Sequence, residues 1–277
     1  MTKLTFGSDP EFFYTENGGI IPPVFLLGEG RRIIWKDNFP YRVYEETDEI
    51  AVTSDGAAFE LVVSPKEDWE ELFDTIQKGI QMTDSLVNHE KAKLRIIPAA
   101  RIFKKYLVDE TLITGCRPDY DALLSDWFAK EVMEGSPYRY AGAHLHIGFQ
   151  EDDMRQYVHD NIVPLVQLLG IFVGIPALIN SDELKLEALR LKKYGKPAKY
   201  RIPEHGVEYR STSNNWIKNK DLAATLFENV EKVVEIFKNP EEGGKILEKF
   251  VKPMSDGFTN QDFGLLQSVY NDAVKLI

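Results

Sequence analysis

The run Gly7-Ser8-Asp9-Pro10-Glu11-Phe12-Phe13 carries the first strong indication of the fold and of a site on it. In an extended chain, side chains two positions apart point to the same face, so Asp9 and Glu11 are expected to lie together. Two carboxylates this close repel each other unless protons or cations share the site. Oxygen ligands suit a hard ion such as Mg²⁺ or Mn²⁺. The run therefore predicts either a metal site or a solvated turn in which Pro10 ends a strand.

A second acidic position follows in the run Asp55-Gly56-Ala57-Ala58-Phe59-Glu60-Leu61-Val62-Val63. Glu60 lies inside an apolar strand pattern and shares its face with small or apolar residues. A carboxylate in such a place costs free energy unless it reaches a sheet edge or is held by a cation. Both interpretations of Glu60 stay open at this point.

Two histidines occupy one face of a glycine-flanked strand pattern in Ala141-Gly142-Ala143-His144-Leu145-His146-Ile147-Gly148-Phe149. Neutral imidazole is a metal ligand, and protonated imidazole contacts phosphate. A single histidine here would more often be a satisfied core residue, but two on one face favour a functional interpretation. Zinc is less expected, because carboxylates outnumber imidazoles and the chain has a single cysteine, Cys116.

Basic residues gather later in the chain, ahead of and within the run Gly206-Val207-Glu208-Tyr209-Arg210-Ser211. Glu208 and Arg210 share a strand face, which by itself could be an ordinary surface ion pair. Upstream residues add positive charge, namely Arg190, Lys196 and Arg201. Such a cluster suits a polyphosphate, because arginine gives bidentate contacts to phosphate oxygens.

The composition limits the classes of function. The 277 residues hold 33 Lys and Arg against 44 Asp and Glu, a formal net charge of −11, which argues against a general nucleic-acid binder and against a peripheral protein of acidic membranes. No Walker-type loop and no dinucleotide glycine fingerprint is present. A single cysteine excludes an internal disulfide, and the beginning of the chain lacks the apolar region of a signal peptide. We therefore expect a cytoplasmic protein.

One uncharged stretch, Ile162–Ile179, is near the lower length limit of a membrane span. It contains prolines and glycines and stands alone without flanking basic residues, so we expect a buried core helix that ends near Pro176.

The remaining patterns predict one α+β domain over residues 1–277, with residues 219–277 as a helical C-terminal part. Strands are expected at Lys3–Phe6, Phe12–Thr15, Arg32–Trp35, Tyr41–Tyr44, Ala58–Val63, Leu94–Ile97, Tyr138–Phe149 and Val207–Ser211. Helices are expected at Lys66–Asn88, Ala99–Leu107 and Glu151–Ile179, with three more after Asn219 that break near Pro240 and Pro253.

In this order, the motifs resemble those of the glutamine synthetase-fold carboxylate–amine ligases. The run Gly7–Phe13 is similar to their Gly-x-Glu-x-Glu-Phe-Phe strand, with Asp9 in place of the first glutamate. Gly142–His146 is similar to their Gly-Met-His-x-His segment. Arg201-Ile202-Pro203, followed by Glu208-Tyr209-Arg210, is similar to their Arg-Ile-Pro…Glu-x-Arg run, and Asn215 falls near the asparagine that follows it. The short length, Gly115–Asp119 and Tyr194-Gly195-Lys196 resemble the phage-encoded amidoligases, called carboxylate–amine ligase type 2.

This resemblance implies a curved antiparallel sheet that forms a funnel for ATP and two or three Mg²⁺ or Mn²⁺ ions, with helices on its outer face. By position, the metal ligands would be Asp9, Glu11, Glu60, His144 and Glu208. Contacts to phosphate would come from His146, Lys196, Arg201 and Arg210, with Arg190 and Asp55 as further candidates. The residues nearest the chemistry would be Arg210, His146 and Glu208.

The implied reaction converts a small-molecule or peptide carboxylate to an acyl phosphate, which an amine then attacks. Three alternatives stay open: a phosphotransferase like the guanidino kinases, a metal-dependent hydrolase and a non-catalytic nucleotide-binding module. Release of phosphate with a stable amide distinguishes the ligase from the kinase, and nucleotide binding distinguishes it from the hydrolase.

Overall fold

The strands of the protein form two sheets in the computed structural model, which describes residues 2–36, 39–112, 119–123, 126–128 and 136–277. The first sheet is antiparallel. In spatial order it contains β1 (Leu4–Gly7), β13 (Leu145–Phe149), β15 (Gly206–Tyr209), β14 (Lys199–Arg201), β10 (Asp119–Asp121) and β11 (Asp126–Phe128).

The second sheet is mixed, because one of its strand pairs, β3 with β9, is parallel. In order it contains β12 (Tyr138–Tyr140), β9 (Ala99–Ile102), β3 (Gly19–Ile21), β2 (Glu11–Glu16), β7 (Ala58–Val63), β6 (Ile50–Asp55), β5 (Phe39–Glu46) and β4 (Arg32–Lys36), with β8 (Lys93–Arg95) also pairing with β2. The α+β class is therefore as predicted, but the strands divide between two sheets instead of forming one antiparallel sheet.

The chain passes between the two sheets more than once, and two of these passages, residues 8–11 and 141–144, lie side by side. Together with residues 211–215, which pair with the second passage, they form what we call the seam. The first segment joins β1 to β2, and the second joins β12 to β13. The Glu11 N–H donates to the carbonyl of Gly142 at 2.8 Å. The side-chain amide of Asn214 donates to the carbonyls of Glu11 at 2.8 Å and Ile97 at 3.1 Å. These bonds fix the ends of several strands against one another.

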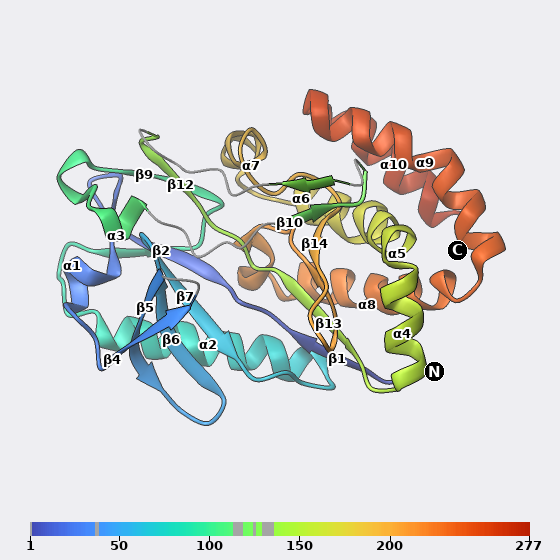
Figure 1. The fold of residues 1–277 in the computed structure, drawn as a ribbon. Helices are drawn as coiled ribbons and strands as arrows, with labels where there is room; N and C mark the ends of the chain where they lie inside the picture. The colour runs from blue at the N-terminus through green and yellow to red at the C-terminus, as the bar shows by residue number, and fades with distance from the viewer. Residues whose placement is uncertain (1, 37–38, 113–118, 124–125, 129–135) are drawn as a thin grey trace.

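Helix α2 (Trp69–Leu86) covers one face of the second sheet, where it packs on β6 and β7 (Figure 1). Its buried side chains follow the predicted helical spacing and include Leu72, Ile76 and Ile80. The side chain of Asp68 caps the first turn by accepting the Glu70 N–H at 2.6 Å. Because α2 occupies this face, the paired carboxylates of Glu11 on β2 and Glu60 on β7 lie on the other one.

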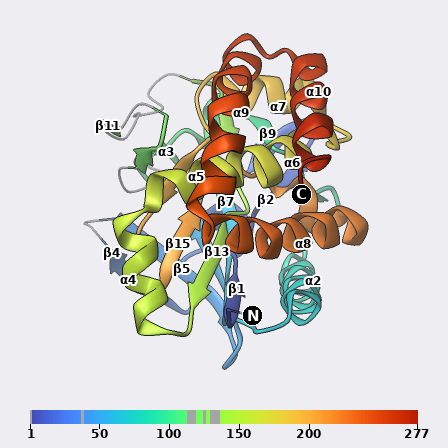
Figure 2. The same cartoon turned by 90° about the vertical axis from the view of Figure 1, so that its right-hand side faces the viewer.

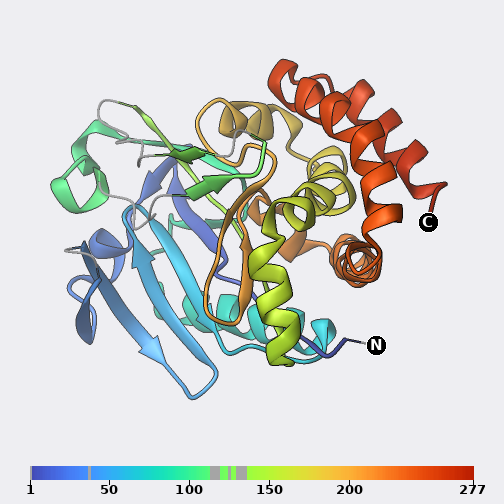
Figure 3. The same ribbon diagram turned by 45° about the vertical axis from the view of Figure 1, so that its right-hand side comes forward.

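The apolar face of the first sheet packs on helices. Helices α4 (Asp152–Asp160) and α5 (Ile162–Leu169) lie against β13 and β15 (Figure 3). Behind α5 lie α8 (Lys220–Phe237), α9 (Pro240–Asn260) and α10 (Phe263–Val274), which form the helical side of the molecule in Figures 1 and 2. Shorter helices are α1 (Pro23–Leu27), α3 (Asp109–Leu112) and α7 (Leu184–Leu191).

The uncharged stretch Ile162–Ile179 is a core segment, with 78% of it buried inside the structure. The prediction that it ends near Pro176 is wrong, because α5 continues through a π-helical turn, η2 (Gly170–Gly174), into α6 (Ile175–Ile179). Proline has no N–H to donate to the carbonyl four residues earlier, which is that of Phe172. The buried side chain of Asn229 donates to this carbonyl instead, at 2.7 Å.

Three further predictions differ from the structure. Ala99–Leu107 is not a helix, because Ala99–Ile102 pairs with β3 and β12 as strand β9, followed by the short 3-10 turn η1 (Lys104–Tyr106). Tyr138–Phe149 is not one strand, because the chain changes sheets between β12 and β13. Pro253 lies inside α9. The N–H that proline lacks would have donated to the carbonyl of Lys249, and Lys249 is exposed. The break comes instead at Gln261, in the left-handed region at φ 54°.

Candidate functional site

The charged side chains lie on one face of the first sheet, in two rows set by strand register. In the first row, Gly7 pairs with His146, His146 with Glu208, and Glu208 with Arg201. The second row consists of residues two positions away from members of the first row along the chain. It brings together Asp9, His144 and Arg210. The opposite face carries apolar residues such as Leu145 and Tyr209, which are fully buried. Four strands therefore place acidic, imidazole and guanidinium groups on one side.

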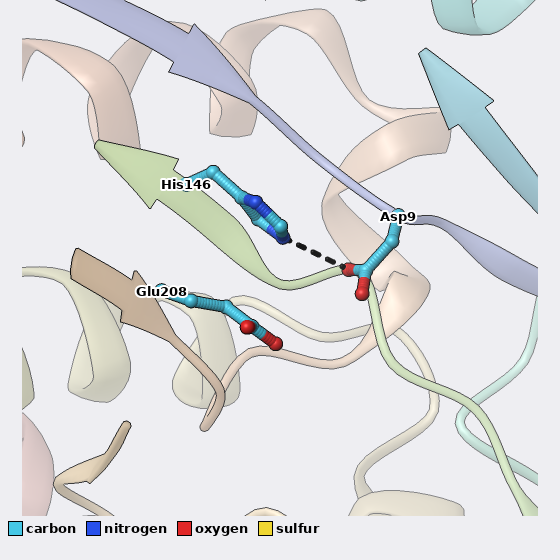
Figure 4. A group of neighbouring side chains, drawn as sticks. All are labelled: Asp9, His146 and Glu208. Carbon is cyan, nitrogen blue, oxygen red and sulfur yellow. Dashed lines mark ion pairs between the residues drawn. The ribbon is translucent and has the colours of Figure 1, made fainter. Parts of the chain in front are cut away.

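Asp9, His146 and Glu208 form a group suited to a cation (Figure 4). One potential ligand atom from each lies within 4.8 Å of the others. The Nε2 of His146 is 3.7 Å from Asp9 Oδ1, and among the described residues this buried nitrogen has no hydrogen-bond partner. The three residues come from the end of β1, from β13 and from β15, so the group depends on the sheet and not on one loop.

The electrostatics keep this group charged. Burial disfavours the carboxylate of Asp9, but the neighbouring His144 and His146 outweigh it and hold its pKa well below the usual range. Burial likewise opposes a positive charge on His146, yet the nearby carboxylate of Asp9 raises the pKa of this imidazole. Asp9 is therefore an anion at neutral pH.

His144 is placed differently from His146, although both contact Asp9. Its side chain is 2% exposed, against 28% for His146. Its Nδ1 is 3.0 Å from Asp9 Oδ2, and its Nε2 is 2.9 Å from the hydroxyl of Tyr194. Burial and the charge of Arg210 lower the pKa of the ring. We predicted His144 as the metal ligand and His146 as the phosphate contact, but the geometry places His146 and not His144 in the group suited to a cation.

Gly142 makes room for the ring of His144. A Cβ at this position would lie 2.7 Å from the Nε2 of His144, closer than side chains tolerate. The glycine of the Gly-Ala-His motif is thus explained by the close approach of the imidazole to the backbone.

Glu208 lies between two arginines. Its Oε1 accepts a hydrogen bond from Arg210 Nη1 and is 3.5 Å from Arg201 Nη1. Burial raises the pKa of Glu208, but Arg210, His144 and His146 together outweigh this and lower it below the usual value. Arg210 is 2% exposed, and its Nη2 also donates to the Tyr194 hydroxyl at 2.9 Å. The predicted Glu-x-Arg pair is therefore a buried ion pair facing the acidic group.

A second acidic group lies across the seam, at the end of β2. Glu11 and Glu60 are directly paired on neighbouring strands, so their side chains share a face. Glu11 is 6% exposed and accepts the Gly142 N–H at 2.7 Å. Burial and the nearby charges of Asp55 and Asp9 hold its pKa well above the usual value. Like charges brought together in this way are what a cation would relieve.

The predicted basic cluster is only partly assembled. Arg190 is 1% exposed and donates to the backbone carbonyls of Ser211 at 2.9 Å and Thr212 at 3.0 Å. The side chain of Lys196 is exposed. The predicted segment Gly115–Pro118, which includes Cys116, lies outside the described residues, as does the side chain of Asp119.

Sequence reasoning gave no role to three residues near this site, Tyr194, Lys199 and Asp121. In the sequence, Tyr194 is distinguished only as part of the Tyr194-Gly195-Lys196 motif, but it contacts both His144 and Arg210. Lys199 precedes Arg201 by two positions, so alternation alone could have placed it on the same face. Its Nζ lies 3.4 Å from the carboxylate of Asp121 on β10.

No model of a known protein family matches the chain, and no match was found among curated proteins. The function is therefore argued from the residues and their arrangement.

Proposed function

We propose that the protein is an ATP-dependent carboxylate–amine ligase of the glutamine synthetase fold, which forms an amide bond through an acyl phosphate and releases ADP and phosphate. One observation carries the proposal. The potential cation ligands Asp9, His146 and Glu208 converge on one face of the first sheet. On that face, Arg201 and Arg210 both reach the carboxylate of Glu208. Cation ligands and phosphate-binding groups on neighbouring strand positions are what such a reaction requires.

The donor set fits Mg²⁺ or Mn²⁺. Asp9 and Glu208 supply carboxylate oxygens, and His146 supplies a nitrogen without a competing partner among the described residues. Glu11 and Glu60 would hold a further ion across the seam. When bound, such ions neutralise charge on the phosphoryl oxygens as the bond to the leaving group breaks.

In the proposed reaction, a carboxylate oxygen of the substrate attacks the γ-phosphorus of ATP, and the bond to the bridging oxygen breaks to release ADP. The amine then attacks the carbonyl carbon, loses a proton, and phosphate leaves. Arg201 lies at the outer part of the row and would bind the nucleotide phosphates. Arg210 is buried beside Glu208 and would stabilise the phosphoryl group during transfer. Exclusion of water protects the acyl phosphate.

This proposal implies a cytoplasmic enzyme, within a host cell if it is encoded by a phage, because ATP and a carboxylate–amine pair must both be supplied there. The substrates would be a small-molecule or peptide carboxylate and an amine, with no nucleic acid or membrane involved.

The test combines nucleotide binding with product analysis. We expect Mn²⁺-dependent ATP binding by isothermal titration in the intact protein, and loss of this binding in Glu60→Gln. The exposed Glu71 on α2 offers a matched control, and Glu71→Gln should bind as the unchanged protein does. A screen of amino acids, polyamines and cell-wall peptides should then reveal ADP, phosphate and amide in equal amounts. Stoichiometric AMP, or ATP binding unaffected by both Glu60→Gln and EDTA, would refute the proposal.

A metal-dependent hydrolase is the second candidate, favoured by the mixed nitrogen and oxygen donors of the Asp9 group, which also suit hydrolytic metal ions. It needs no nucleotide. Turnover of an amide or ester in the presence of Mn²⁺ and the absence of ATP would support it over the ligase.

A further inference from the structure

Tyr194 connects two members of the second row, His144 and Arg210, from outside the strands. It lies between α7 and β14 and is half-buried. Its hydroxyl is 2.9 Å from Arg210 Nη2 and 2.9 Å from His144 Nε2. One phenol oxygen therefore contacts both the buried guanidinium and the buried imidazole.

The donor and acceptor roles in this network follow from elementary chemistry. A guanidinium has no acceptor, so the Tyr194 oxygen accepts the hydrogen bond from Arg210. The hydroxyl proton can then point to His144 Nε2, which accepts it when the ring carries its own proton on Nδ1. In a neutral ring the remaining proton lies on Nδ1, and there it is donated to Asp9 Oδ2 at 3.0 Å.

The opposite tautomer does not suit the surroundings. With the proton on Nε2, the Nδ1 lone pair would point at the two oxygens of Asp9, at 2.9 and 3.0 Å, and both partners would be acceptors. Arg210 Nη1, the nearby donor, is farther from Nδ1, at 3.3 Å, than either oxygen of Asp9. A doubly protonated ring would place a second positive charge, almost fully buried, against Arg210.

The backbone and a neighbouring arginine hold Tyr194 in this place. Its ring packs on the guanidinium of Arg190, 5.0 Å from the ring centre, and its N–H donates to the Arg190 carbonyl at 2.7 Å. Gly195 follows at φ 71°, and a Cβ there would lie 1.9 Å from Arg190 Nη1. Arg190 is itself fixed on the carbonyls of Ser211 and Thr212. The hydroxyl therefore has a defined position.

We propose that Tyr194 is a positioning residue. Its hydroxyl directs the ring proton of His144 to Asp9 and fixes the guanidinium of Arg210 by accepting its hydrogen bond. His146 is then the imidazole that binds the cation. The inference deepens the proposed function, because it rests on the cation group formed by Asp9, His146 and Glu208. The inference also assigns a role to Arg190, because this arginine orients Tyr194.

The first experiment needs no ligand and no variant of Tyr194. Long-range ¹H–¹⁵N NMR of the metal-free protein at neutral pH reports which ring nitrogen carries the proton, and His144→Gln assigns the His144 signals among those of the five histidines. We expect the proton on Nδ1. A proton on Nε2 would overturn the inference, whatever the protein binds.

The second experiment measures Mn²⁺ affinity by titration. Tyr194→Phe removes only the hydroxyl, and we expect affinity to fall about tenfold, as is usual when a residue that orients metal ligands is lost. Tyr157→Phe is the matched control, because this hydroxyl lies 3.5 Å from the carbonyl of Phe237, away from the site. It should leave affinity unchanged. Equal affinities in both variants would refute the role of Tyr194.

Asp9→Asn separates this inference from the proposed function. If Asp9→Asn abolishes Mn²⁺ binding but Tyr194→Phe does not weaken it, the cation group stands and Tyr194 has no positioning role. If Asp9→Asn leaves Mn²⁺ binding intact, the cation group itself is wrong and both proposals fall.

Discussion

The bond from Asn229 to the carbonyl of Phe172 makes a prediction about stability that does not depend on the function. Pro176 cannot donate to this carbonyl, and the Asn229 amide replaces the missing donor at 2.7 Å while also contacting the Tyr270 hydroxyl at 3.1 Å. Asn229→Asp keeps the size of the side chain and replaces the donor by an acceptor. Leaving the buried carbonyl without a donor costs about 1–3 kcal/mol, and burying a charged carboxylate beside it adds to this.

For a chain of this length each kcal/mol shifts the midpoint of thermal unfolding by roughly 2–4 °C, so we expect Asn229→Asp to lower it by at least about 4 °C at pH 7. Asn271→Asp is the matched control: this asparagine is exposed on α10, and surface changes usually stay within about 0.5 kcal/mol. Calorimetry or circular dichroism measures both. Equal midpoints for the two variants would refute the account of the π-helical turn.

The pH dependence of the same variant gives a second check. A carboxyl buried at position 229 should have a pKa above that in the unfolded chain, because burial disfavours its charged form. Its protonated form is compatible with the fold and can donate to the Phe172 carbonyl, so the variant loses least stability at acidic pH. The loss should grow as the pH rises through the folded-state pKa. A loss that is constant from pH 4 to pH 8 would contradict this.

Three other expectations concern the site. Arg210→Lys should lower the kcat of amide formation by roughly ten- to a thousandfold, whereas Arg201→Lys should mainly raise the KM for ATP; steady-state ADP release measures both. Gly195→Ala should destabilise the protein, because its Cβ would meet Arg190 at φ 71°, while Gly244→Ala in exposed α9 should stabilise it by about 0.5–1 kcal/mol in thermal unfolding. ATP should bind only with a divalent cation present, and titration in EDTA should give no heat of binding.

The local patterns predicted much of the first sheet face. Alternation along a strand placed His144 with His146 and Glu208 with Arg210, and both pairs indeed share a face. The boundaries of Ala58–Val63 coincide with β7, because a β-branched and aromatic run between a turn and a proline leaves little freedom. Alternation is a property of the local chain, so a local pattern is sufficient to predict it.

The pairing between strands could not be predicted in the same way. That Glu208 lies between His146 and Arg201 depends on the register of three strands, one of which, β13, is far from β14 and β15 in sequence. Ala99–Ile102 became a strand because β3 and β12 are available to pair with it, which overrides the weak local preference for a helix. The position of Tyr194 depends on Arg190 and Gly195 together, and no spacing rule contains that information.

The seam gives the site its electrostatic character. The chain changes sheets here, so carboxylates from both sheets lie close to one another and to a small number of arginines. The acidic members are Asp9, Glu11, Asp55, Glu60 and Glu208, and the arginines that contact this group are Arg201 and Arg210. The five carboxylates exceed the two guanidiniums even if both histidines are protonated. Burial, together with the neighbouring charges of Asp55 and Asp9, raises the pKa of Glu11. A polyphosphate and a substrate carboxylate would add further negative charge, so binding without divalent cations would be opposed by the site itself. The same excess that disfavours ATP alone would attract the ions first, so the proposed function predicts that divalent cations bind before ATP.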